Sequence, residues 1–185
     1  PRYEPEPVTV TLGNIAVPFP EGAFLQATLD GEEALVAAVQ AHIGDATRVA
    51  DLFSGLGTFA LSLPAKVHAV EGARDALLGL KMAVNRTSRP VTTEHRDLFR
   101  KPLTPDELAA FDAVILDPPR AGAQDQVDQL ARSIVPRIAY VSCNPATFAR
   151  DAKILIAGGY RLDSIKPVGQ FRWSTHVELA AAFRR

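Results

Sequence analysis

The only cysteine of the chain, Cys143, is the first candidate for chemistry. It follows the apolar run 138–142, which predicts a strand with the thiol at its end. A thiolate is a strong nucleophile when positive charge lowers the pKa of the thiol, and we expect Arg120 or Arg150 to supply that charge. A structural cysteine is usually buried and inert, so position alone leaves both interpretations open.

A glycine-rich segment, residues 51–60, forms the second candidate site. Its pattern from Gly55 to Ala60 is G-x-G-x-x-A, in which glycines let the backbone approach a ligand and begin a helix, predicted over 55–63. The same pattern fits a dinucleotide-binding fold. Asp51 distinguishes a dinucleotide-binding loop from one that binds another ligand. A carboxylate is unfavourable beside a pyrophosphate but suits a cationic ligand with amine donors. S-adenosylmethionine is such a ligand.

Further acidic residues follow or open predicted strands. Glu71 suits ribose hydroxyls, and Asp97 suits an adenine amine. Asp117 precedes two prolines, which fix the backbone and present the carboxylate at a rigid edge. Glu178 begins the last strand and would matter if a second acid–base group were needed near the cysteine. For each of these residues the alternative is a solvated surface carboxylate.

The predicted elements would bring these residues together. Residues 1–20 predict a β-hairpin around Gly13-Asn14, and 21–185 predict one domain of alternating strands and helices. This alternation indicates an α/β fold with a doubly wound, mostly parallel seven-stranded sheet, which binds ligands at the carboxyl ends of its strands. The strands are expected at 48–53, 67–70, 91–95, 111–116, 138–142, 160–165 and 177–183, and the helices at 30–43, 55–63, 76–85, 106–110, 124–134 and 148–157.

Composition narrows the class of protein. The 185 residues have a net charge of −1, but residues 1–119 carry 10 basic and 16 acidic side chains, and residues 120–185 carry 10 basic and 5 acidic ones. The basic part could hold phosphates, or it could be an ordinary solvated surface. One cysteine excludes a disulfide framework and four-cysteine metal sites within this chain, and we expect no metal. No apolar run is long enough for a membrane helix, and we expect a cytoplasmic protein.

Taken together, the motifs resemble the S-adenosylmethionine-dependent RNA uracil-5 methyltransferases of tRNA and 23S rRNA. The resemblance covers about residues 22–183, and the run around the cysteine is its most specific part. It is carried by Phe24-Leu25-Gln26, the loop 51–59, Val70-Glu71-Gly72, the run 116–122, Val141-Ser142-Cys143-Asn144-Pro145-Ala146-Thr147, Ala149-Arg150-Asp151 and His176-Val177-Glu178.

The resemblance implies a class I methyltransferase fold and a covalent mechanism. In such a mechanism Cys143 attacks carbon 6 of a uracil in tRNA or 23S rRNA, carbon 5 takes the methyl group, and Glu178 removes the carbon-5 proton. Phe24 would stack on the flipped base, and Arg120 and Arg150 would bind the RNA. The cofactor contacts it implies are Gln26, Phe53, Gly55, Thr58, Glu71, Asp97 and Asp117.

The chain departs from the family pattern in several places. Thr58 replaces a frequent Asn, Ser54 replaces a frequent Cys, and residues 172–175 replace a Pro-His-Thr-type run. The residues before Phe24 are too few for the oligonucleotide-binding and central domains of many members. We therefore expect the natural chain to extend upstream into an RNA-binding domain, and we expect a monomer.

Three other functions remain as alternatives. An amino methyltransferase acting on adenine or cytosine would use the motif Asp117-Pro118-Pro119, but Arg120 stands where an aromatic residue is expected and Cys143 would be idle. A non-catalytic methyltransferase-like RNA-binding domain would keep the basic region without needing the cysteine. A dinucleotide-dependent oxidoreductase is disfavoured by Asp51.

Overall fold

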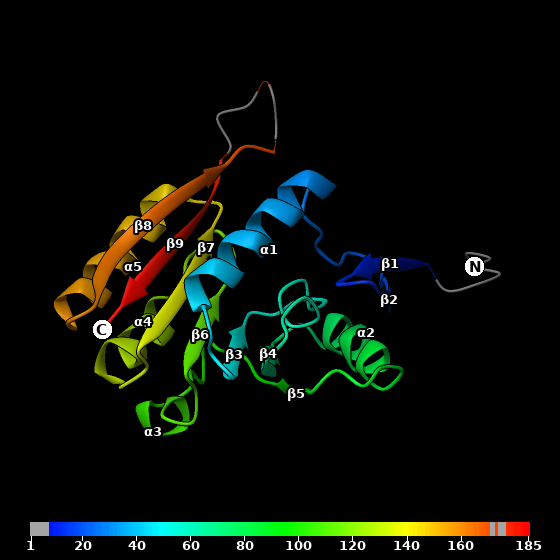
Figure 1. The fold of residues 1–185 in the computed structure, drawn as a ribbon, viewed down its shortest axis with the longest axis horizontal. Helices are drawn as coiled ribbons and strands as arrows, with labels where there is room; N and C mark the ends of the chain where they lie inside the picture. The colour runs from blue at the N-terminus through cyan, green and yellow to red at the C-terminus, as the bar shows by residue number, and fades with distance from the viewer. Residues whose placement is uncertain (1–7, 171–172, 174–176) are drawn as a thin grey trace.

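A seven-stranded sheet forms the centre of the protein in the computed structural model, which describes residues 8–170, 173 and 177–185 (Figure 1). The strand order is β5-β4-β3-β6-β7-β9-β8; the first five strands are parallel, and β9 runs antiparallel to both β7 and β8. The sheet strands are β3 (Arg48–Leu52), β4 (Lys66–Glu71), β5 (Val91–His95), β6 (Ala113–Leu116), β7 (Arg137–Ser142), β8 (Arg161–Val168) and β9 (Glu178–Arg184). The predicted mostly parallel sheet is confirmed.

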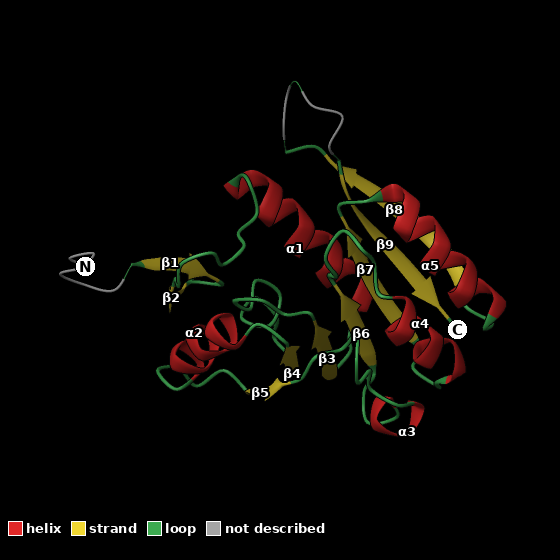
Figure 2. Ribbon diagram, turned by 180° about the vertical axis from the view of Figure 1, so that it is seen from behind, coloured by secondary structure: helices red, strands yellow, loops and turns green. Residues whose placement is uncertain are grey.

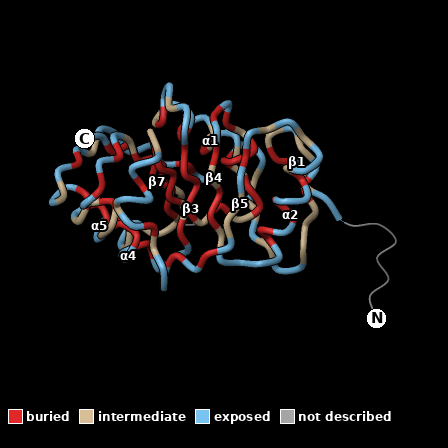
Figure 3. Tube along the Cα trace, turned by 90° about the horizontal axis from the view of Figure 1, so that it is seen from below, coloured by how far each residue is buried: buried red, intermediate tan, exposed pale blue. Residues whose placement is uncertain are grey.

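Helices cover both faces of this sheet, as the prediction of a doubly wound fold requires (Figure 2). One hydrophobic core contains apolar side chains of α1 and α2, and a second contains those of α3, α4 and α5. Successive residues of β3 alternate between them, with Val49 in the first core and Ala50 in the second. The helices are α1 (Leu29–Ile43), α2 (Arg74–Val84), α3 (Pro105–Leu108), α4 (Gln124–Arg132) and α5 (Pro145–Ala157). The central strands are accordingly buried along most of their length (Figure 3).

The predicted N-terminal hairpin is also present. Strands β1 (Thr9–Leu12) and β2 (Ile15–Pro18) pair antiparallel around Gly13 and Asn14, which both have positive φ, at 55° and 66°. Two adjacent positive φ angles are the signature of the tight turn that Asn and Gly favour. Leu12 and Val17 are buried in the same core as α1 and α2, so the hairpin packs onto the main fold. Among the described residues, no helix is long and apolar enough to cross a membrane.

One predicted helix is wrong. Residues 55–63 form a series of turns instead, in which the N–H of Gly57 donates to Ser54 and that of Leu61 donates to Gly57. The N–H of Ala60 donates to the carboxylate of Asp51 at 3.0 Å rather than to a carbonyl one turn earlier. The positive φ of Gly57, 93°, also departs from helical backbone. A side chain therefore replaces the hydrogen bond that would have continued a helix.

Candidate active site

The carboxyl ends of four parallel strands place the predicted residues along one edge of the sheet. Phe53 follows β3, Glu71 ends β4, Asp117 follows β6 and Cys143 follows β7. Such an edge is where open α/β sheets bind ligands. A hollow of about 310 Å³ also lies between β2 and α2, but none of the candidate site residues lines it.

The register between β7 and β9 brings Cys143 and Glu178 together. Ser142 pairs with Leu179 at the end of the antiparallel ladder, so Cys143 lies one residue beyond this pair on one strand and Glu178 one residue before it on the other. Both residues are half-buried. Burial and the charges of Glu178 and Asp117 raise the pKa of the Cys143 thiol, although Arg120 lowers it in part. Arg120 thus acts on the thiol in the expected direction, but burial and the two carboxylates outweigh it.

Glu178 itself has a raised pKa because it is half-buried at the beginning of β9. A raised pKa brings a carboxylate closer to neutrality and makes it a better proton acceptor. Residues 171–172 and 174–176 lie outside the described part of the chain, and with them His176 and all of the run 172–175 except Trp173.

The glycine-rich loop is held close to the end of β4 by Glu71. One carboxylate oxygen of Glu71 accepts from the N–H of Gly55 at 2.8 Å, and the other accepts from the N–H of Ala73 at 2.6 Å. Gly55 has a φ of 53°, and a Cβ there would meet no heavy atom within 4 Å. Phe53 adopts a positive φ of 63°, and Thr58 is half-buried with its carbonyl accepting from Ser62. The backbone of the loop at Gly55 thus faces open space, and the carboxylate of Glu71 holds it in place.

Two buried polar atoms beside this loop have no hydrogen-bond partner among the described residues, Oδ1 of Asp51 and Oγ of Ser54. Asp51 has no exposed surface, and burial together with the charge of Glu71 raises its pKa to about 7. Leaving such atoms unpaired costs about 1–3 kcal/mol each. Their donor and acceptor capacity, beside an open glycine backbone, fits a polar ligand that carries positive charge and amine or hydroxyl groups. S-adenosylmethionine is of this chemistry.

Asp117 adds a further carboxylate to the same edge. Burial is the largest cause that raises its pKa, the charges of Glu178, Asp51 and Glu71 add to it, and together they bring the pKa to about 8. A pKa near 8 means that the free protein holds this carboxyl largely protonated at neutral pH. Four carboxylates that interact in this way favour a cation between them.

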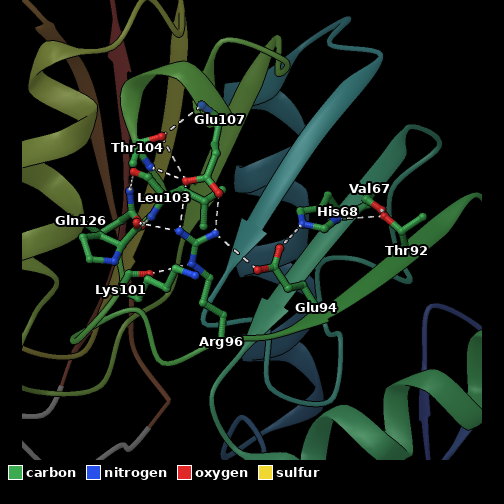
Figure 4. Close-up of polar contacts among 11 residues, drawn as sticks. Val67, His68, Thr92, Glu94, Arg96, Lys101, Leu103, Thr104, Glu107 and Gln126 are labelled. Carbon is green, nitrogen blue, oxygen red and sulfur yellow. Dashed lines mark hydrogen bonds and ion pairs between the residues drawn. The ribbon is translucent and has the colours of Figure 1, made fainter.

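Asp97 lies beyond β5 and is exposed, and its carboxylate accepts from the N–H of Phe99 at 3.0 Å. Phe99 in turn packs against Phe53, with ring centroids 5.3 Å apart. The neighbouring Arg96 is buried and fixes this segment: it donates to the carbonyl of Lys101 at 2.7 Å and to that of Pro102 at 2.9 Å (Figure 4).

Arg96 also pairs with two carboxylates, Glu107 at 2.7 Å and Glu94 at 3.3 Å, and its guanidinium holds the pKa of Glu107 at about 2 (Figure 4). The chain between β5 and α3 is therefore rigidly anchored next to Asp97. Sequence reasoning missed Arg96, because an arginine directly after a strand has the same spacing as a solvated one.

The two predicted RNA-binding arginines differ in their surroundings. Arg120 is exposed, and its carbonyl accepts from Asn144 and Thr147. Arg150 donates to the buried carboxylate of Asp151 at 2.8 Å and to the carbonyl of Ala121 at 3.0 Å. Arg150 thus braces the loop after Asp117 in the free protein, and Arg120 leaves its side chain at the surface.

The segment before α1 carries the last two candidates. Phe24 is 73% exposed, an unusual position for a large aromatic side chain. Gln26 accepts a hydrogen bond from Gln170 at 2.7 Å, so the connection after β8 reaches this segment. The geometry leaves Phe24 free to contact a ligand and holds Gln26 in place.

The sequence and structure of this chain are similar to those of known proteins. Residues 88–185 match the tRNA (uracil-5-)-methyltransferase family. An uncharacterized RNA methyltransferase of Zymomonas mobilis is 58% identical over 186 residues, covering all of this chain and 47% of that protein. The chain belongs to the tRNA (uracil-5-)-methyltransferase family.

Two further members agree with this assignment. The 23S rRNA (uracil(1939)-C(5))-methyltransferase of Alteromonas mediterranea is 40% identical over 141 residues, covering 74% of this chain and 29% of that one. The crystal structure of Pyrococcus abyssi tRNA (uracil-54, C5)-methyltransferase with S-adenosyl-L-homocysteine has a TM-score of 0.83 and 30% identity, covering 96% of this chain and 44% of that one. The predicted methyltransferase fold is confirmed, and the chain spans about half the length of the curated relatives it matches.

For this member of the uracil-5-methyltransferase family, sequence reasoning also missed Gln170. The residue lies between Gly169 and Phe171, where neither spacing nor charge marks it. Only the structure points to a role for Gln170, since its side chain is buried and hydrogen-bonded to a segment 142–144 residues away in the chain. Among the described residues, no group of three His, Cys, Asp or Glu side chains is placed to hold a metal ion.

Proposed function

We propose that this protein transfers a methyl group from S-adenosylmethionine to carbon 5 of a uridine in tRNA or rRNA. The observation that carries the proposal is the continuation of the Ser142–Leu179 pair by Cys143 and Glu178, a nucleophile and a base at the ligand-binding edge of a methyltransferase sheet. Membership of the tRNA (uracil-5-)-methyltransferase family supports the same substrate class.

The proposed reaction explains why both residues are needed. Carbon 5 of uracil is a weak nucleophile, and addition of the Cys143 thiolate to carbon 6 moves the electron pair of the C5–C6 double bond into an enolate that is nucleophilic at carbon 5. Carbon 5 would then bond to the methyl group, and the sulfur–methyl bond of S-adenosylmethionine would break to leave S-adenosylhomocysteine. Glu178 accepts the proton from carbon 5, the C5–C6 double bond forms again, and the sulfur–carbon bond breaks to release the thiolate.

S-adenosylmethionine would supply the electrophilic methyl group and a positively charged sulfonium. Asp51, Glu71 and Asp117 would surround it. Burial and, after it, the charges of neighbouring carboxylates raise the pKa values of Asp51 and Asp117, and a bound cation would favour their charged forms. Gln26, Phe53, Gly55, Thr58 and Asp97 complete the proposed contacts. A cation between these carboxylates would also offset the charge that raises the thiol pKa, so that the Cys143 proton leaves to solvent when the cofactor is bound.

The proposed RNA face comprises Phe24, Arg120 and Arg150. Phe24 is exposed and suits stacking on a flipped base, and Arg120 is exposed and suits a phosphate. Since the curated relatives are about twice as long, we also propose that the complete protein adds RNA contacts from outside this domain of residues 21–185. The domain itself is proposed to act as a monomer.

The experiment is methyl transfer from labelled S-adenosylmethionine to unmodified tRNA and rRNA, followed by nucleoside analysis. 5-methyluridine is the expected product, with Cys143→Ala abolishing it while cofactor binding is retained. N6-methyladenosine or N4-methylcytidine would instead establish an amino methyltransferase. Cofactor binding without any methylated nucleoside would indicate a non-catalytic RNA-binding domain, and turnover by Cys143→Ala would exclude the covalent route.

A further inference from the structure

Gln170 connects the end of β8 to the segment before α1. Its Oε1 accepts from the N–H of Ala27 at 2.7 Å and from that of Thr28 at 3.4 Å, and its Nε2 donates to Oε1 of Gln26 at 2.7 Å. Gln170 is 9% exposed. Its side chain also packs on Gly31, where a Cβ would come within 2.7 Å of Gln170 Cγ. The first turn of α1 is thus shaped to receive this glutamine.

These contacts fix the orientation of the side-chain amide of Gln170 and, through it, that of Gln26. A backbone N–H is always a donor, so the group of Gln170 that faces Ala27 must be its oxygen. The NH₂ group of Gln170 then faces Gln26, which must present its own oxygen in return. The oxygen of the Gln26 amide is thus used by Gln170. Among the described residues, no acceptor is bonded to the NH₂ group of Gln26. Gln26 is therefore oriented as a donor toward whatever lies beside it.

We propose that Gln170 is a positioning residue that holds the Gln26 amide with its two N–H donors toward an oxygen acceptor of the bound cofactor, a carboxylate or hydroxyl. The inference rests on the proposed cofactor contact of Gln26 and assigns it a direction. An acceptor oxygen on Gln26 would serve an ammonium group, whereas the donor found here serves an oxygen.

The variant Gln170→Glu tests this orientation. It keeps the length of the side chain and can still accept from Ala27 and Thr28, but it offers Gln26 an acceptor instead of a donor. Gln26 must then turn its NH₂ group toward residue 170 and its oxygen toward the ligand. We expect the Kd for S-adenosylmethionine to rise about tenfold, since a mismatched buried hydrogen bond costs about 1–3 kcal/mol. The KM for the cofactor should rise likewise, with kcat at saturating cofactor retained.

Gln124→Glu is the matched control, because it adds the same charge at an exposed position at the beginning of α4. It should bind the cofactor as the unaltered protein does. S-adenosylmethionine carries a net positive charge, so an added carboxylate would by charge alone strengthen binding, and a weaker Kd points to the hydrogen bond.

An unchanged Kd in folded Gln170→Glu would overturn the inference. If this variant does not fold, Gln26→Glu decides instead: it still accepts from Gln170 but presents only acceptors, and unchanged cofactor binding there would equally overturn the proposal. Absence of cofactor binding by the unaltered protein is a different result, which would count against the proposed function itself.

Discussion

The phenol of Tyr140 donates a 2.7 Å hydrogen bond to Asp151, a carboxylate with no exposed surface. The same carboxylate accepts from the N–H of Ala123 at 2.8 Å and pairs with Arg150. Tyr140 lies in β7, two residues before the strand ends, and Asp151 lies in α5. Asp151 therefore ties together the strand that leads to Cys143, the following helix and the loop after Asp117.

Replacing Asp151 should destabilise the protein strongly. Asp151→Asn leaves Arg150 without its carboxylate and places NH₂ against donors, so we expect the free energy of unfolding in urea to fall by about 3 kcal/mol. Tyr140→Phe removes one donor and should cost about 1 kcal/mol. Asp163→Asn, at an exposed carboxylate paired with Arg161 and Arg184, is the control and should cost clearly less than Asp151→Asn. Equal losses for Asp151→Asn and the control would show that the network does not anchor the fold.

The carboxyl of Asp117 should make the stability of the ligand-free protein depend on pH. Its pKa is about 8 in the folded protein against an ordinary value of 3.8, so between these values the folded state binds more protons than the unfolded one. The stabilisation is fully present below pH 4 and is lost as the pH rises through 8. We expect Asp117→Asn to melt higher than the unaltered protein at pH 8, with a smaller difference at pH 5.

The control for this pH effect is Asp112→Asn. Hydrogen bonds from Thr47 and Arg48 hold the pKa of Asp112 at about 2, so its contribution is lost only as the pH falls toward 2. Asp112→Asn should therefore lower the melting temperature by the same amount at pH 5 and pH 8. A difference between Asp117→Asn and the unaltered protein that is the same at both pH values would contradict the raised pKa of Asp117.

The thiol of Cys143 should become more reactive when Glu178 loses its charge. Glu178 raises the pKa of the thiol, so Glu178→Gln should lower that pKa and increase the rate of alkylation by iodoacetamide at pH 8. The rate is followed by mass spectrometry of the peptide that contains Cys143, the only thiol of the chain. Glu33→Gln, at an exposed position of α1, serves as the control and should leave the rate unchanged. A slower reaction in Glu178→Gln would mean that the two groups do not interact as described.

Periodicity in the sequence predicted most of the fold, because buried parallel strands and amphipathic helices leave distinct patterns of apolar residues. The hairpin at Gly13-Asn14 was predictable because turn chemistry there is local. The segment 55–63 was not, since the N–H of Ala60 donates to the side chain of Asp51 and not to a carbonyl of a helix.

Part of the candidate site was likewise predictable from the sequence, and part was not. Strand ends placed Glu71, Asp117 and Cys143 at one edge from sequence alone. The direction in which the pKa of the Cys143 thiol shifts was not predictable, because it depends on burial and on Glu178 and Asp117, which lie close to the thiol in space, as well as on Arg120. Gln170 was invisible for a related reason, since its partners lie at the other end of the chain.

The central claim is that Cys143 adds covalently to the uracil, and 5-fluorouridine RNA tests it most directly. Fluorine at carbon 5 cannot leave as a proton, so Glu178 cannot complete the reaction. Incubating the protein with this RNA and S-adenosylmethionine should give a denaturation-resistant adduct, with the methylated nucleotide mapped by mass spectrometry to Cys143. Cys143→Ala should give none. Methylation of ordinary uridine RNA at carbon 5 with no adduct on the fluorinated RNA, or an adduct on any other residue, would contradict the account.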